Sequence, residues 1–254
     1  MNSYPNLNQI ARRALVLKPV IIHAISSPPP HILKQISEKM SAEEFTHFKN
    51  EASANNAANW QRVKEIGLWE DMSPAEKEFA GCFMDTMDHG DQINFSWRME
   101  AMAMILWALN VIEELPPIDE MVKHEILKDF PADNDVQAFL QKAKLRSREE
   151  IEEARNLLEM WNWRSRTRQL MESAPAGSHN FDEIIRSTAR KCFDDGLLSE
   201  ITDEDFTAFS KAFRDLDDSE WRMTGSIIQE RHFALNWLCA YADNNNWDET
   251  PTDT

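Results

Sequence analysis

The sequence predicts an all-α protein, a single multi-helix globular domain with an extended C-terminal tail. Glycine, which weakens helices, provides only 6 of the 254 residues, while good helix formers such as Ala, Leu, Glu, Lys and Met are plentiful. Hydrophobic residues make up 42% of the chain, enough for a sizeable core at this length. Apolar residues also recur at the three- and four-residue spacing of a helix face.

The N-terminal residues predict a helix and then a stop. Leu7–Leu17 has a helical pattern, and the apolar run Val20–Ile22 extends it only briefly after Pro19. The triple proline Pro28–Pro30 then ends regular structure. We therefore expect residues 1–30 to form an N-terminal helix and a proline-rich turn, followed by an all-helical domain over residues 31–254.

Capping boxes mark the next two helices. In Ser41-Ala42-Glu43-Glu44, the hydroxyl and the last carboxylate can each satisfy a free backbone N–H, which predicts a helix toward Ile66 with Gly67 as its stop. Ser73-Pro74-Ala75-Glu76 adds a proline at a position that needs no donor. It predicts a helix to about Met87.

The middle of the chain contains the most apolar predicted helix, Ile93–Glu114, which ends before Pro116-Pro117. A short helix over Ile118–Leu127 is expected to follow. Ser147-Arg148-Glu149-Glu150 predicts the start of another long helix, which runs through Met171.

Ala174–Asn180, with its proline and glycine, is the clearest loop of the second half and the place where the helical domain could be subdivided. The helices predicted after it are Phe181–Phe193, Asp203–Phe213 with Thr202 as its cap, and Glu220–Ala242. The tail Asn244–Thr254 is expected to be extended and anchored by Trp247.

The charge balance argues against nucleic acid and membrane surfaces as partners. Acidic residues outnumber basic ones by 44 to 27, and the formal charge of −17 repels phosphate backbones and anionic lipids. A basic protein partner would be attracted. Glu200–Glu220 concentrates the effect with eight carboxylates against only Lys211 and Arg214. The same run is also what a solvated helix face looks like.

The cysteines and apolar runs predict a cytoplasmic protein without a membrane span. Cys82, Cys192 and Cys239 are an odd, widely spaced set without zinc-ligand spacing, typical of reduced thiols. Arg12–Ile22 resembles an export signal, but Lys18 and Pro19 interrupt its apolar run. The longest apolar stretch elsewhere, Ala101–Leu109, is far shorter than the roughly 20 residues of a transmembrane helix.

Three charged residues lie on otherwise apolar helix stripes and therefore need partners. They are Glu100 in the most apolar helix, Arg164 in the long helix after Ser147, and Glu230 in the last helix. A buried charge without a partner costs several kcal/mol. The planar fork of an arginine can accept two carboxylates.

We therefore expect Glu100 and Glu230 to converge on Arg164, with Arg98 and Arg231 nearby. Asn236 lies on the same helix as Glu230 and could orient a bound group. Two interpretations of this polar cluster remain open. It is either an internal tie that specifies packing or a pocket that holds a ligand.

No catalytic residue, cofactor or metal site is predicted. No nucleophile elbow, zinc-protease motif or phosphate-binding glycine loop is present. Asp85, Asp88, His89 and Asp91 are rich in oxygen ligands but are typical of a polar helix end. Glu44 and His47 supply one E-x-x-H, whereas a helical dimetal site needs two.

Several segments resemble a widespread bacterial family catalogued as domain of unknown function 4272. The segments are Leu68-Trp69 with Ser73–Glu76, Trp97–Glu100 leading into Leu106–Leu109, Trp163-Arg164, Glu230–Leu238, and Trp247-Asp248 running to Pro251–Thr254. The resemblance implies a single all-helical domain and supplies no agreed activity, cofactor or catalytic residue. Pro28–Asn59 departs from the pattern, so the resemblance supports no role there.

These observations favour a non-enzymatic protein-interaction module with an acidic surface and a basic protein partner. The alternative is a small-ligand-binding protein or an enzyme that uses the buried Glu/Arg cluster.

Overall fold

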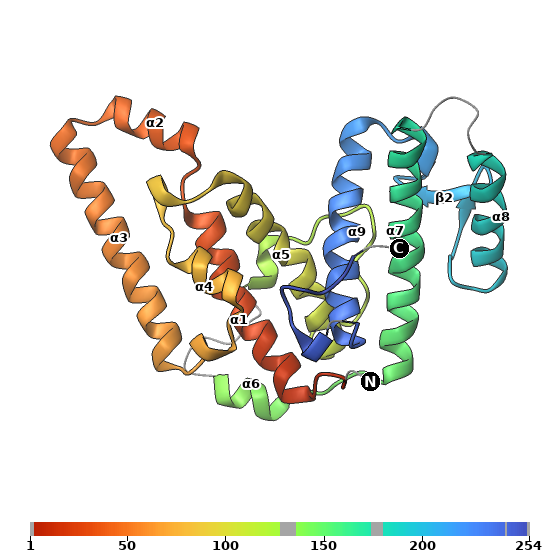
Figure 1. The fold of residues 1–254 in the computed structure, drawn as a ribbon, viewed down its shortest axis with the longest axis horizontal. Helices are drawn as coiled ribbons and strands as arrows, with labels where there is room; N and C mark the ends of the chain where they lie inside the picture. The colour runs from red at the N-terminus through yellow and green to blue at the C-terminus, as the bar shows by residue number, and fades with distance from the viewer. Residues whose placement is uncertain (1–2, 128–135, 174–179, 242, 253–254) are drawn as a thin grey trace.

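A row of four helices forms the body of the protein in the computed structural model, which describes residues 3–127, 136–173, 180–241 and 243–252. The helices are α1 (Leu7–Ser26), α5 (His89–Ala108), α9 (Asp218–Leu238) and α7 (Arg148–Ser173), and each packs on the next in that order (Figure 1). The predicted all-α class is confirmed. The row brings the N-terminal helix and the last helix onto opposite sides of α5.

The core runs through this row. Residues 101–106 of α5 are completely or almost completely buried, and α1 contributes Ala14, Val16 and Leu17, each with an exposed fraction of 0%. Residues of α1 and of the later helices belong to one continuous hydrophobic core. The N-terminal helix is therefore an integral part of that core.

One edge of the molecule carries the α2–α3 hairpin, formed by α2 (Pro30–Lys39) and α3 (Ala42–Glu65) (Figure 1). Only Trp60 and Val63 of α3 are buried, so this helix contacts the body mainly near its C-terminal end. The short elements η1 (Trp69–Asp71), α4 (Pro74–Ala80) and η2 (Met84–Thr86) follow. The first two contact α1, and η2 contacts α2. Further along the chain are η3 (His124–Leu127) and α6 (Val136–Lys142).

At the opposite edge of the molecule, the helix predicted over Asp203–Phe213 is absent and a small sheet takes its place, so this prediction is wrong. After α8 (Phe181–Asp194), the chain forms a small antiparallel sheet of β1 (Ile201–Thr202), β2 (Asp205–Ala208) and β3 (Lys211–Ala212), followed by η5 (Phe213–Asp215). Ile201 pairs with Phe206, and Thr207 pairs with Ala212. Both two-residue turns have positive φ, at Asp203 and Glu204 and at Phe209 and Ser210, without the glycine or asparagine that normally marks such turns.

Helix starts agree with the capping signals. Ser41 and Ser73 form the predicted capping boxes with Glu44 and Glu76, and Ser147 forms the same reciprocal bonds with Glu150 ahead of α7. Gly67, with φ +74°, follows the end of α3 as predicted. These starts depend on contacts within four residues, which explains why the sequence is sufficient to place them.

Helix ends differ more from prediction. The helix predicted to run to Met87 ends at Ala80, and the short helix expected over Ile118–Leu127 is reduced to the turn η3. The helix predicted over Ile93–Glu114 spans His89–Ala108 and closes at Asn110, whose φ is +56°. Val111 N–H donates to the Leu106 carbonyl, which makes this end a Schellman motif with asparagine in place of glycine.

α1 continues through Pro19 to Ser26, beyond the end predicted for it. Proline removes one helical hydrogen bond, but the surrounding core holds the next turn in place, since Val20 and Ile21 are fully buried. The last helix starts at Asp218 and ends at Leu238, four residues before the predicted end.

The C-terminal segment packs back onto the body after the short turn η6 (Asp243–Asn245), with Trp247 buried at 5% exposure as the predicted anchor. The loop predicted to allow subdivision, Ala174–Asn180, lies almost entirely outside the described residues. Within the described ranges, no helix has the length and apolar character needed to cross a bilayer.

Candidate functional site

The predicted cluster on Arg164 is not formed, because its two carboxylates pair elsewhere. Glu100 pairs with Arg231, whose Nε and Nη2 lie 2.9 and 2.8 Å from Glu100 Oε2. Both residues are 1% exposed. Burial lowers the pKa of Arg231, and the charge and hydrogen bond of Glu100 oppose that shift.

This pair also organises the connection after α5. Arg231 donates to the carbonyl oxygens of Pro116, Pro117 and Glu120, at 2.7 to 2.9 Å. Glu100 Oε1 accepts the N–H of Val122 at 2.8 Å. The guanidinium and the carboxylate are thus used within the protein, and they tie α5, α9 and the loop together.

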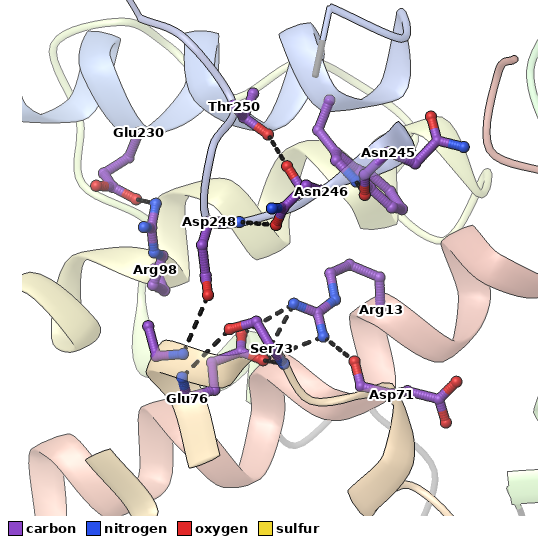
Figure 2. A network of polar contacts seen from close by, with 12 residues as sticks. Arg13, Asp71, Ser73, Glu76, Arg98, Glu230, Asn245, Asn246, Asp248 and Thr250 are labelled. Atoms are coloured by element: carbon purple, nitrogen blue, oxygen red, sulfur yellow. Dashed lines mark hydrogen bonds and ion pairs between the residues drawn. The ribbon is translucent and has the colours of Figure 1, made fainter. Parts of the chain in front are cut away.

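Glu230 pairs with Arg98 rather than with Arg164 (Figure 2). Arg98 Nη1 lies 3.0 Å from Glu230 Oε2, and the guanidinium lies 4.0 Å from the centre of the Phe233 ring. Burial raises the pKa of Glu230, Arg98 opposes the shift, and the nearby Glu100 adds to it. The predicted proximity of Arg98 to Glu230 is therefore correct, although its role is that of the partner itself.

Arg164 pairs with Asp205, a residue for which the sequence predicted a place in the helix Asp203–Phe213. The two form a bidentate pair, with Nε and Nη2 at 2.6 and 2.7 Å from the two carboxylate oxygens, and their exposed fractions are 1% and 0%. Burial raises the pKa of Asp205, but the bonds and charge of Arg164, with the N–H groups of Phe206 and Arg214, outweigh it and lower the pKa.

Asn236 connects α9 to α7 and to the C-terminal segment. Its side-chain oxygen accepts from Arg155 Nε at 2.9 Å, and its amide donates to the Pro251 carbonyl at 2.8 Å. Arg155 is also paired with Glu159. Asn236 therefore takes part in neither the Arg98–Glu230 pair nor the Glu100–Arg231 pair, although Asn236, Arg98 and Arg231 all lie on or against α9.

A second polar network holds the C-terminal segment between α1, α4 and α5 (Figure 2). Arg13 and Glu76, both almost fully buried, form an ion pair at 3.0 Å. Asp248 accepts the N–H of Ala75 at the start of α4, at 3.0 Å. In the sequence Glu76 is recognisable only as a helix cap, and its pairing with Arg13 cannot be predicted because nothing local links the two positions.

Trp247 lies at the centre of this network. Its ring packs edge-on against Phe233 and Trp237, with centroids 4.7 and 5.3 Å apart, and Arg13 lies 4.9 Å from the ring centre. Arg98 also lies 5.8 Å from the centre of the same ring, so the C-terminal segment packs beside the Arg98–Glu230 pair.

The side chains that the sequence offers as metal ligands have structural roles in this fold. Asp88 caps α5 by accepting from the Asp91 N–H, and Asp85 pairs with Lys49. Glu44 completes the capping box of Ser41. Over the described ranges, no three His, Cys, Asp or Glu residues gather closely enough to hold a metal ion.

Two adjoining hollows lie along α7 and α8 and share Asp195 and Leu197. We name the first the acidic groove; its volume is about 450 Å³. It is lined by Trp107, Leu115, Glu150, Glu153, Ala154, Leu157, Asp195, Gly196 and Leu197. The second, of about 470 Å³, continues past Met160 to Lys191 and Cys192.

A third hollow, the α1–α3 pocket, lies at the other edge of the molecule and has a volume of about 230 Å³. Its apolar lining comes from Leu15, Pro19 and Ile22 of α1, from Trp60, Val63, Ile66 and Leu68 in and after α3, and from Val136 of α6. Its polar lining consists of Lys18, His23, Ser26, Asn56, Asn59 and Arg62.

Comparison with known families identifies the chain. The family DUF4272, described as a domain of unknown function, matches residues 3–184. The chain belongs to this family. No curated protein and no solved structure matches it.

The DUF4272 match covers both walls of the α1–α3 pocket and the α7 side of the acidic groove. It also includes Arg98, Glu100 and Arg164. Their partners Glu230, Arg231 and Asp205 lie beyond its last residue, as do the segments Glu230–Leu238 and Trp247–Thr254 that suggested the family.

Proposed function

We propose that this DUF4272 protein is a non-enzymatic interaction module that binds a basic protein partner in the acidic groove. The observation that carries the proposal is the placement of Glu153 and Asp195 beside an apolar floor. Neither carboxylate forms an ion pair within the described part of the chain, and Leu157 and Leu197 line the same hollow.

This combination suits a lysine or arginine side chain. Such a side chain places its apolar stem on apolar surface and its charged head against carboxylates. Glu150, the third carboxylate of the groove, is already shared with Ser147 and Arg146. The net charge of −17 would steer a basic partner toward the protein before it docks.

A peptide titration tests the proposal. The probe is a short fluorescent peptide in which lysine alternates with leucine, and the protein variant is Glu153→Gln with Asp195→Asn. Each lost contact is worth about 0.5 kcal/mol at an exposed site, so the double variant is expected to bind about fivefold more weakly.

The matched control changes the net charge by the same amount at positions outside the groove. Glu38→Gln with Glu43→Gln alters two exposed carboxylates of the α2–α3 hairpin, far from the groove. It is expected to leave the affinity nearly unchanged. Equal weakening in both double variants would mean that the peptide senses only overall charge, and the groove assignment would then be wrong.

We also propose that Arg98, Glu100, Arg164, Glu230, Arg231 and Asn236 are structural ties rather than a ligand site. Support comes from their hydrogen bonds, which are made to one another, to the backbone and to Asp205 and Arg155. No observation at these residues favours an enzyme.

A cytoplasmic location remains part of the proposal. All three cysteines are free thiols. Burial raises the pKa of Cys239 to about 12, which leaves that thiol unreactive at neutral pH. Free thiols are typical of a reducing compartment.

A further inference from the structure

The acidic groove continues into the hollow beside it. Asp195 and Leu197 line both hollows, and Met160 lines the second one. Both hollows lie where α8 stands beside α7 (Figure 1). The surface open to a partner is therefore longer than the acidic groove alone, and its far end is apolar.

The α7 wall of the two hollows is one face of that helix. It consists of Glu150, Glu153, Ala154, Leu157 and Met160. Spacings of three, four and seven residues place these side chains on the same side of α7. At a rise of ~1.5 Å per residue, the wall from Glu150 to Met160 is about 15 Å long, which is the length of about three helical turns.

The opposite wall, at the end of α8, has no backbone N–H to offer an extended partner. The N–H groups of Asp195, Gly196 and Leu197 all donate to carbonyl oxygens in the last turns of α8. No residue of β1, β2 or β3 is among those lining the two hollows. A partner strand would therefore find no edge to pair with, whereas a partner helix satisfies its own backbone groups.

Carboxylates come from both walls of the acidic groove. Glu153 belongs to α7 and Asp195 to the end of α8, and the half-buried Leu157 and Leu197 line the same groove. Lys191 is the only base among the described lining residues, and it lies in the second hollow. A helix whose apolar stripe is bordered by basic residues on both sides matches this distribution of charge.

We propose that the basic partner docks as an amphipathic α-helix of about three turns, which lies along α7 across both hollows. Its apolar stripe packs on Leu157, Met160 and Leu197. The lysine or arginine side chains that border the stripe reach Glu153 and Asp195. This inference rests on the proposed function, because it names the form of the partner that the acidic groove receives.

Two fluorescent peptides of equal length and identical leucine and lysine content test the form of the partner. In the helical peptide leucine recurs at spacings of three and four residues, and in the extended peptide it alternates with lysine. Both are titrated below the concentration at which they self-associate. We expect the helical peptide to bind at least tenfold more tightly, and circular dichroism to show a gain of helix on binding.

Two methionines of α7 provide a matched pair of variants for the second hollow. Met160 lines it, whereas Met171 is exposed and is not among the residues lining either hollow. Met160→Gln is expected to weaken binding of the helical peptide about fivefold, and Met171→Gln to leave it unchanged. The comparison of the two peptides uses the wild-type protein, so it tests the inference even if Met160→Gln lowers the stability.

The outcomes distinguish this inference from the proposed function. Tighter binding of the helical peptide, weakened by Glu153→Gln with Asp195→Asn and by Met160→Gln, supports both. Equal or tighter binding of the extended peptide that remains sensitive to the double variant overturns the helix and leaves the acidic groove as the site. Equal affinity in Met160→Gln and Met171→Gln overturns the extension into the second hollow.

Two further results overturn the proposed function and the helix together. The first is that neither peptide binds, or that binding is unaffected by Glu153→Gln with Asp195→Asn. The second is a wild-type protein that sediments as a dimer and dissociates in this double variant, because the occupant of the groove would then be a second copy of the chain.

Discussion

Arg164 and Asp205 form an ion pair from which water is almost completely removed, with exposed fractions of 1% and 0%. Asp205 also accepts from the backbone N–H groups of Phe206 and Arg214. The carboxylate therefore holds the small sheet against α7. Removing one member of such a pair leaves the other charge buried, which is far more costly than removing both.

We expect Asp205→Asn to lower the free energy of unfolding by about 3–5 kcal/mol, because it leaves the Arg164 charge without its counterion. Urea denaturation measures the change. Replacing both residues by leucine should recover much of the loss. Glu204→Gln is the control, since Glu204 pairs with Arg186 at the surface and should have little effect. A loss below 1 kcal/mol in Asp205→Asn would contradict this account.

His23 gives the stability a defined pH dependence. Burial lowers the pKa of His23 below its ordinary value of 6.5. Below about pH 6.5, the unfolded chain therefore binds a proton at this position that the folded protein does not, and the free energy of unfolding falls as the pH decreases. Above that pH the penalty is absent.

His23→Gln is expected to lose less stability than the wild-type protein between pH 7 and pH 5. Glutamine keeps an N–H that can donate to the Cys82 carbonyl but does not titrate. Urea denaturation at several pH values measures the difference, in which contributions from other groups largely cancel. Parallel curves for the two proteins would show that His23 does not carry the dependence.

Helix α1 stays helical past Pro19 because the surrounding core packs against it. Pro19 lies inside the helix, where proline is unfavourable by about 3 kcal/mol relative to alanine. Pro19→Ala restores the missing backbone donor, but it also gives the unfolded chain more freedom, an effect of about 0.4–1 kcal/mol in the opposite direction.

We therefore expect Pro19→Ala to raise the free energy of unfolding by about 2 kcal/mol, measured by thermal and urea denaturation. Lys18→Ala is the control because it changes the neighbouring position without restoring a hydrogen bond. If Pro19→Ala destabilises the protein, the proline ring is needed to pack the wall of the α1–α3 pocket.

The C-terminal segment shows how an irregular element is positioned by side chains. Trp247 fills the space between Phe233, Trp237 and Arg13, and Asp248 bonds to the first turn of α4. The segment thereby joins both ends of the chain to the core. Its place depends on contacts to residues far apart in the sequence.

For the whole molecule, the continuous core predicts that the chain unfolds as one unit. The row α1, α5, α9, α7 links the N-terminal helix to the last helix, and Arg231 ties that row to the loop after α5. We propose that the predicted divisions, at residue 30 and near residues 174–180, do not mark separately folding parts.

Unfolding in urea, followed by far-ultraviolet circular dichroism and by tryptophan fluorescence, is expected to give one transition with the same midpoint. Tryptophans report both edges, since Trp60 lies in α3 with Trp69 against it, and Trp161 packs on Phe206 of β2. Two transitions with separate midpoints would instead favour a subdivided chain.

The sequence by itself determined the helical class and the starts of α3, α4 and α7. Capping boxes operate within four residues, so Ser41, Ser73 and Ser147 carry the necessary information locally. It also identified Glu100, Arg164 and Glu230 as charges that need partners, because their neighbours on each helix stripe are apolar.

Only the tertiary structure decided which partners these charges have. Arg164 binds Asp205 instead of a glutamate because a hairpin, whose turns lack the usual glycine signal, places that aspartate against α7. The acidic groove and the α1–α3 pocket likewise depend on how distant elements are spaced. Pair choice and cavity shape come from the relative placement of helices, which local residue patterns do not encode.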